Sequence, residues 1–257
     1  MISDNQIASI IDRVVEQLAT PSHKAERTFV KSQAPSAPSF YTGDALGCFT
    51  TIEEAIIAAE KAFLEYKEVS VEQRKKIIAA IRELCLENLT TLARLALDET
   101  GMGRFDDKIR KNEVAINQTP GTEDLEPIAF TGDYGLTLLE RAPYGVIGSI
   151  TPSTNPSETI INNTISMIAG GNAVAFNPHP GAKKTSVFTV NLINKAIISA
   201  GGPPNLITTV ANPTIESANT LMTHPKVGLL VVTGGPAVVA SAMKSGKRVV
   251  AAGPGNP

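Results

Sequence analysis

The stretch that decides the fold is Val227-Gly-Leu-Leu-Val-Val-Thr-Gly-Gly-Pro236, in which a run typical of a buried strand ends in a glycine turn. A helical pattern follows at once. A parallel strand that ends this way leaves the free N–H groups and the positive end of the next helix facing outward, where a phosphate binds well. The turn lacks the G-x-G-x-x-G spacing, because Val239 stands where the last glycine would fall, so an ordinary strand-to-helix connection remains the alternative.

Further apolar runs of strand length lie beyond Tyr144, and helical patterns separate them. Together with the first run, they occupy residues 145–150, 173–176, 206–210, 227–232 and 247–251. This alternation predicts a parallel sheet that is covered by helices on both faces. Ligands of such sheets bind at the carboxyl ends of the strands, and the glycine turn lies at one such end.

The part of the chain before these strands has helical periodicity, from residue 50 to about residue 118. One predicted helix places Ile52, Ile56 and Phe63 on the same face, and a longer one runs from Ile77 to Ala96. A turn at residues 99–103, which contains two glycines, ends the longer helix.

The N-terminus is predicted to be a short amphipathic helix over residues 1–19, with an apolar stripe that includes Ile7, Ile11 and Val14. Residues 20–46 contain prolines, serines and almost no aliphatic side chains, which predicts a flexible linker. A helix this short is marginal until something covers its apolar face. It therefore either docks on its own domain as an arm or serves as an address for another protein.

The bulk composition excludes several classes of function. The chain has 257 residues, enough for one or two domains, and a net charge of -2 with scattered basic residues, so it offers no basic face for nucleic acid. The apolar runs are too short to span a bilayer, and no secretory signal precedes them. Cys48, expected in a loop, and Cys85, expected on an apolar helix face, have no metal-ligand spacing, so we expect two reduced, inert thiols and no metal site.

Small and polar residues follow four of the predicted strands. After residue 150, Asn155 is expected to be the N-cap of a helix, Pro156 its first residue and Glu158 the partner in a capping box. The loop at 177–181 contains His179, for which a bond to nearby backbone is favoured over catalysis. Several such turns along one edge of a sheet favour a ligand site.

The residues of these turns resemble the aldehyde dehydrogenase superfamily, and in particular its CoA-acylating branch, found in bacterial microcompartments. The resemblance covers essentially the whole chain. It rests on Glu99-Thr-Gly-Met-Gly103, Asp107-Lys108, Lys111-Asn112, Thr119-Pro-Gly121, Pro152-Ser-Thr-Asn-Pro156, Pro178-His-Pro-Gly-Ala-Lys183, Val232-Thr-Gly-Gly235 and Gly253-Pro-Gly-Asn-Pro257.

The resemblance implies an α/β fold with a Rossmann-type parallel sheet and flanking helices, preceded by an N-terminal helical segment. It also implies NAD as cofactor, coenzyme A as co-substrate, a thiolate nucleophile and a short aldehyde, propionaldehyde or acetaldehyde, as substrate. Asn155 would donate to the oxyanion, although it is displaced by one place from the asparagine of hydrolytic relatives. Carried over by position, the cofactor-binding residues would be Thr151, Pro152, Ser153, Asn177, His179, Thr214, Thr233, Gly234, Gly235, Val238 and Gly253.

Two differences from the hydrolytic relatives bear on the reaction. Ala251 stands where those enzymes carry the glutamate that activates water, which disfavours hydrolysis to a free acid and leaves a thioester for a thiol acceptor. The family's nucleophilic cysteine lies beyond Pro257, and neither Cys48 nor Cys85 matches it. The resemblance therefore predicts that residues 47–257 are the NAD-binding domain of a longer enzyme whose catalytic domain is absent. The alternative is a non-catalytic nucleotide-binding and targeting module.

The resemblance extends to the N-terminal helix and linker, which are similar to the encapsulation peptides of the branch. It implies that residues 1–19 bind a microcompartment shell protein, that the complete enzyme is a homo-oligomer, and that it works inside a bacterial microcompartment in the cytoplasm. The choices between propionaldehyde and acetaldehyde, and between NAD and NADP, stay open. Asn177 and Pro180 stand where relatives vary.

Overall fold

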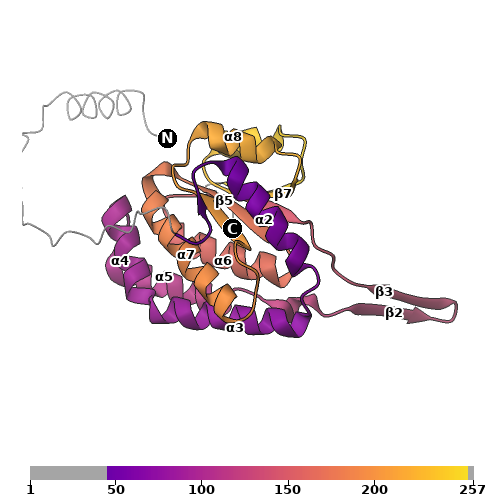
Figure 1. Ribbon diagram of the computed structural model, residues 1–257. Coiled ribbons are helices and arrows are strands. Elements are labelled where there is room, and N and C mark those ends of the chain that lie inside the picture. Colours follow the sequence, from indigo (N-terminus) through magenta and orange to yellow (C-terminus); the bar gives the residue numbers. More distant parts are fainter. Residues whose placement is uncertain (1–44, 254–257) are drawn as a thin grey trace, which may run out of the picture. The chain divides into compact units, whose positions relative to one another are not determined.

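The structure, a computed structural model, describes residues 45–253, which all belong to one compact unit. The predicted helix at 1–19 and nearly all of the predicted linker at 20–46 lie outside the described residues. Within them, the fold is the predicted α/β type, with a parallel sheet between layers of helices (Figure 1). None of the described helices is long and apolar enough to cross a lipid bilayer.

The main sheet has six strands in the order β1-β6-β5-β4-β7-β8, and every neighbouring pair is parallel. The five predicted strands are confirmed, with ends that shift by one or two residues. The sixth was missed, and it places Cys48 in an edge strand rather than in a loop. The strands are β1 (Cys48–Phe49), β4 (Val146–Thr151), β5 (Ala173–Pro178), β6 (Ile207–Val210), β7 (Val227–Thr233) and β8 (Val249–Ala252).

Helices cover both faces of this sheet (Figure 1). On one face lie α2 (Ile52–Tyr66) and α8 (Ile215–Thr223), and on the other lie α6 (Pro156–Ala169) and α7 (Lys183–Ser199). Outside α6 and α7, a further layer is formed by α3 (Val71–Glu87), α4 (Leu89–Thr100) and α5 (Phe105–Gln118). The short α9 (Pro236–Met243) follows β7, and two 3-10 turns, η1 (Thr122–Leu125) and η2 (Pro180–Ala182), complete the connections.

The core lies at the middle of the sheet, where all six residues of β4 and all six of β5 are buried. Ile56 of α2 packs from one side and Ile165 of α6 from the other, and both are fully buried. Burying one such side chain contributes about 1.5–3 kcal/mol. A strand that is apolar on both faces can only sit between two layers, which explains why these runs lack the alternation of a half-exposed strand.

The long helix predicted from Ile77 to Ala96 is wrong, because the chain breaks at Asn88 into α3 and α4. Asn88 leaves the helical region, with φ -100° and ψ 13°, and its side-chain Nδ2 donates to the Leu84 carbonyl at 2.9 Å. Asparagine competes with helical backbone bonds in this way. The predicted turn after α4 is confirmed, since Gly101 ends the helix in the left-handed region at φ 65°.

An antiparallel arm of two strands, β2 (Ile128–Gly132) and β3 (Gly135–Leu139), projects from the body (Figure 1). All ten residues of its strands are exposed. The sequence led to no prediction for this segment. Cross-strand partners share a face, so Ile128 with Leu139 lies on one face and Leu138 with Ala129 on the other. Apolar residues on both faces remove the alternating pattern by which such strands are found.

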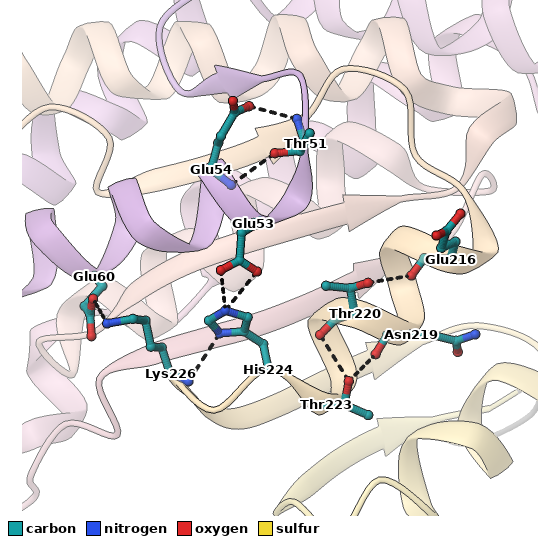
Figure 2. Close-up of polar contacts among 10 residues, drawn as sticks. All are labelled: Thr51, Glu53, Glu54, Glu60, Glu216, Asn219, Thr220, Thr223, His224 and Lys226. Atoms are coloured by element: carbon teal, nitrogen blue, oxygen red, sulfur yellow. Dashed lines mark hydrogen bonds and ion pairs between the residues drawn. The ribbon is translucent and has the colours of Figure 1, made fainter.

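A cluster of polar contacts ties α2 to the turn between α8 and β7 (Figure 2). His224, whose side chain is 8% exposed, accepts the Lys226 backbone N–H at Nδ1 (3.2 Å), so Nε2 carries the proton and donates to Glu53 at 3.0 Å. Lys226 in turn forms an ion pair with Glu60 of α2. The first helix of the domain is thereby fastened to the connection that leads into the glycine-turn strand.

We expect His224→Leu to lower the free energy of unfolding by about 1–3 kcal/mol, because it leaves the Lys226 amide and the Glu53 carboxylate without their partner. Lys226→Gln is the matched control, since it removes only the more exposed ion pair and should cost less than about 1 kcal/mol. Urea unfolding followed by circular dichroism measures both. Equal losses in the two variants would contradict the assignment of the buried imidazole as the main contact.

Candidate functional site

The order of the strands creates a crevice at the carboxyl edge of the sheet. The chain runs from β4 to β5 and β6 on one side, and then returns to β7 on the other side of β4. Neighbouring connections that leave in opposite directions open a crevice outside the strand ends, and open α/β sheets bind their ligands there. The strands that border this crevice are β4 and β7.

The predicted cofactor residues all lie along this edge. Thr151 ends β4, Asn177 lies near the end of β5, Thr233 ends β7, and Gly253 follows β8. Hydrogen bonds connect neighbouring strand ends: the His179 N–H donates to the Thr151 carbonyl at 2.9 Å, and the Gly234 N–H donates to the Ala252 carbonyl at 3.2 Å. The remaining residues of the set, Pro152, Ser153, Thr214, Gly235 and Val238, lie in the loops and first helical turns that follow these strands.

Two of the four helices that begin at this edge already have their N-termini filled. At α7, the carboxylate of Glu99 accepts the Lys184 N–H (2.8 Å), the Thr185 N–H (2.7 Å) and the Thr185 hydroxyl (2.8 Å). At α8, Thr214 and Ser217 form a capping box. These contacts occupy part of the unpaired N–H groups at each helix start, so less is left to bind an anion.

The N-terminus of α9 has neither a side-chain cap nor an acidic residue beside it. Its N-cap, Gly235, makes no side-chain bond, and the first turn carries no acidic residue. A Cβ built on Gly235 would meet no atom within 4 Å, whereas one on Gly234 would lie 2.7 Å from Val238 Cγ1. Open space therefore lies directly in front of an uncapped helix end.

The N-terminus of α6 differs from the sequence prediction. Pro156 is its first residue, as expected, but Asn155 makes no side-chain cap bond and the predicted capping box with Glu158 is wrong. Glu158 instead forms an ion pair with Lys108 of α5 at 3.7 Å, and Asn155 Oδ1 accepts from Lys111 Nζ at 3.3 Å. Contacts from a distant helix have replaced the local pattern on which the prediction relied.

Lys108 is the most unusual charged residue of the site, because its side chain is only 2% exposed. Its ammonium donates to the Thr154 carbonyl and faces the Glu158 carboxylate. Burial lowers the pKa of Lys108, and the Glu158 carboxylate opposes that shift. Losing one partner of such a pair strands the other charge in the interior, so the pair holds α5 against the start of α6.

A cavity of about 530 Å³ lies beside this pair, between α5, α6 and the end of β7. Most of the residues around it have an amide, hydroxyl or charged group, although these side chains also line it with their carbon atoms: Arg110, Lys111, Val114, Ala115, Asn155, Glu158, Thr159, Asn162, Asn163 and Thr233. A larger hollow of about 890 Å³ lies between α3 and the base of the β2–β3 arm, and it contains none of the predicted site residues. The smaller cavity is therefore the one that adjoins the crevice.

Polar side chains at this edge differ in whether their hydrogen-bonding atoms already have a partner. The Thr151 hydroxyl is buried, at 1% exposure, and no described residue bonds to it. His179 Nδ1, in contrast, already accepts the Gly181 N–H at 3.0 Å, and Asn177 Oδ1 accepts the Ser217 hydroxyl at 2.6 Å. A buried hydroxyl without a partner calls for a ligand or water to satisfy it.

Neither described cysteine has the properties of a nucleophile. Both are free thiols, with Cys48 in an edge strand and Cys85 fully buried on α3. Burial raises the pKa of Cys48, and it raises the pKa of Cys85 to about 12. A thiol with a raised pKa stays protonated at neutral pH and reacts slowly.

The contributions of Glu99, Lys108 and Lys111 were missed at the sequence level, although all three stand in motifs that carry the resemblance. A signal existed for Lys108. It lies four and eight residues before Asn112 and Ile116, and these three form the buried stripe of α5. No local pattern marks Glu99 as the cap of a helix that begins more than eighty residues later.

Comparison with known proteins gives a consistent set of relatives. Residues 26–256 match the aldehyde dehydrogenase family. The chain is 50% identical over 248 residues to an acetaldehyde dehydrogenase (acetylating) from Bilophila wadsworthia, covering 96% of this chain and 51% of that protein. It is 45% identical over 257 residues to the propanal dehydrogenase (CoA-propanoylating) of Salmonella typhimurium, covering 100% of this chain and 52% of that protein. The chain thus spans about half the length of the curated relatives it matches.

Solved structures agree with the fold. A propionaldehyde dehydrogenase from the Clostridium phytofermentans fucose utilisation microcompartment superimposes with a TM-score of 0.80 at 54% identity, over 82% of this chain and 49% of that one. The same TM-score holds for Rhodopseudomonas palustris propionaldehyde dehydrogenase with bound CoA and an acylated cysteine, at 47% identity over 82% of this chain and 48% of that one. It also holds for an engineered glycolyl-CoA reductase with bound NADP+, at 46% identity over 82% and 48%.

Proposed function

Because the chain belongs to the aldehyde dehydrogenase family, we propose that it forms the cofactor-binding part of a CoA-acylating aldehyde dehydrogenase. The reaction converts a short aldehyde, NAD+ and coenzyme A into acyl-CoA, NADH and a proton. Propionaldehyde or acetaldehyde is the substrate class, in line with the names of the relatives. The observation that carries the proposal is the crevice between β4 and β7, where the uncapped α9 follows the end of β7 and Thr233 of that strand lines the cavity of Asn155.

Two observations support the binding of a dinucleotide in this crevice. The pyrophosphate would lie on the N-terminus of α9, where the space at Gly235 admits it and no carboxylate competes. At the end of the neighbouring strand, the buried Thr151 hydroxyl has no hydrogen-bond partner among the described residues. When bound, the nicotinamide supplies the hydride acceptor.

We take NAD rather than NADP as the cofactor. In sheets of this kind, an acidic group near the end of the second strand favours the free ribose hydroxyl, and a cation accommodates the extra phosphate. Here the second strand is β5, and the Glu99 carboxylate sits at the N-terminus of the following helix. This carboxylate accepts the Lys184 and Thr185 N–H groups, which would otherwise be available to the 2′-phosphate of NADP.

The acyl acceptor is proposed to be coenzyme A because this part of the site lacks the base of a hydrolase. Ala251 of β8 pairs with Val232 of β7, and its side chain is only a methyl group. A methyl group cannot take a proton from water, so a thioester would persist until a thiol attacks it. Neither Cys48 nor Cys85 is proposed as the nucleophilic thiolate, because burial raises the pKa of both thiols.

Residues 1–19 are proposed to be the address that directs the enzyme into a bacterial microcompartment. Support comes from the amphipathic pattern of the segment and from the microcompartment origin of a relative that is 54% identical. A shell protein is the partner that such an address requires, and its groove would cover the apolar stripe.

The complete product of the reading frame should form propionyl-CoA and NADH from propionaldehyde, NAD+ and coenzyme A, with little free propionate. Replacement of Cys48 and Cys85 by serine should leave this rate within about twofold, because neither thiol takes part. NADH absorbance and chromatography of the acyl-CoA measure the two products. Propionate as the main product, or loss of activity with Cys48→Ser alone, would contradict the proposal.

Gly235→Val should weaken NAD binding by at least about tenfold, which is roughly 1.4 kcal/mol, because the side chain fills the space in front of α9. The backbone there has φ -70° and ψ 165°, which any residue adopts, so folding should survive. Gly132→Val on the arm is the matched control, since its Cβ also meets no atom within 4 Å. Calorimetry of NAD binding decides, and unchanged affinity in a folded Gly235→Val protein would move the pyrophosphate elsewhere.

A further inference from the structure

We propose that Lys111 is a positioning residue, which turns the side-chain amide of Asn155 so that its NH2 group is free to donate to the oxyanion. This inference rests on the proposed function, because it assigns a task within that reaction. Both residues line the same cavity, and Lys111 Nζ lies 3.3 Å from Asn155 Oδ1.

Asn155 does not make the hydrogen bond that is usual for its position. Asparagine at an N-cap normally bonds its side-chain oxygen to an amide of the first helical turn. Asn155 occupies the N-cap of α6 with φ -138° and ψ 65°, and its side chain makes no such bond. Its Oδ1 is directed instead to the Lys111 ammonium. A side chain that gives up its usual local bond is available for another purpose.

The chemistry of the ammonium and amide groups determines which end of the Asn155 amide faces Lys111. An ammonium group only donates hydrogen bonds, so it can bond the oxygen of an amide but never the NH2 end. With Oδ1 held, Nδ2 points away from the lysine, and no described residue accepts from it. An oxyanion site needs a donor that is oriented before the charge develops.

A second lysine of α5 holds the backbone next to Asn155. Lys108 lies one turn before Lys111 on α5 and therefore on the same face of the helix. Its buried ammonium donates to the carbonyl of Thr154, the residue that precedes Asn155. The ion pair with Glu158 fixes Lys108 in turn. Two lysines of α5 thus hold consecutive residues of the loop, one through its backbone and one through its amide oxygen.

The spacing of three residues between Lys108 and Lys111 thus allows the two lysines to hold Thr154 and Asn155 together. Lys108 is unsuited as a probe, because its loss would strand the buried Glu158 carboxylate and endanger folding. Lys111 reaches Asn155 at the surface of the cavity, where a single polar contact is worth little to stability. Its replacement should therefore change catalysis while leaving the fold intact.

The test is a double-mutant cycle in the complete product of the reading frame. Asn155→Ala should lower kcat by about 10²–10³-fold, the usual effect of removing an oxyanion donor. Lys111→Met should lower kcat by about tenfold with little change in KM for the aldehyde, and Lys111→Arg should restore most of it. In the Asn155→Ala background, Lys111→Met should have no further effect. Arg110→Met is the matched control, since this neighbouring cation lines the cavity without bonding Asn155.

A full tenfold loss from Lys111→Met in the Asn155→Ala background would overturn the inference, as would an equal loss from Arg110→Met. These outcomes leave the proposed function standing, whereas an inactive wild-type enzyme would remove it. In that case the oxyanion task falls with the reaction, and the side-chain NH2 resonances of Asn155, identified by their absence in Asn155→Ala, still test the contact with Lys111. They should move in Lys111→Met and not in Arg110→Met, and resonances that ignore Lys111 would refute the contact.

Discussion

The parallel arrangement of the sheet is the constraint on which the rest of the structure depends. Because all six strands run in one direction, every loop that follows a strand opens at the same edge. The reversal of strand order at β4 then decides where along that edge a ligand can enter. Residues as distant in sequence as Thr151 and Gly253 lie along the same edge for this reason.

Among the described residues, four helix N-termini lie at this edge, and α9 is the one that has neither a side-chain cap nor an acidic residue in its first turn. Glu99 fills α7 and the Thr214 capping box fills α8. At α6 the first turn carries Glu158, whose charge is balanced by Lys108. The N-terminus of α9 has neither a cap nor an acidic neighbour. The proposed phosphate site is thus favoured by the side chains that occupy the other helix starts as well as by the glycines of its own turn.

The sequence predicted the parts of this structure that local patterns determine. Near-continuous apolar runs revealed the buried strands, because a strand covered on both faces needs no alternation. The two-residue β1 is too short to carry any pattern, and it exists only because β6 offers it an edge. The capping box at Glu158 failed for a related reason. Local spacing favoured it, but the Glu158 carboxylate instead forms an ion pair at 3.7 Å with the buried ammonium of Lys108, fifty residues earlier. The residues expected to bind the cofactor were found by resemblance, and their hydrogen bonds required the structure.

The central claim is that the cofactor binds between β4 and β7 with its pyrophosphate on α9. Amide hydrogen exchange of the full chain, with and without saturating NAD, tests it most directly. We predict slower exchange in peptides that cover residues 233–240 and 151–159, and a smaller change at residues 183–190, where Glu99 already accepts the Lys184 and Thr185 amides. Protection at 183–190 without protection at 233–240 would contradict this account.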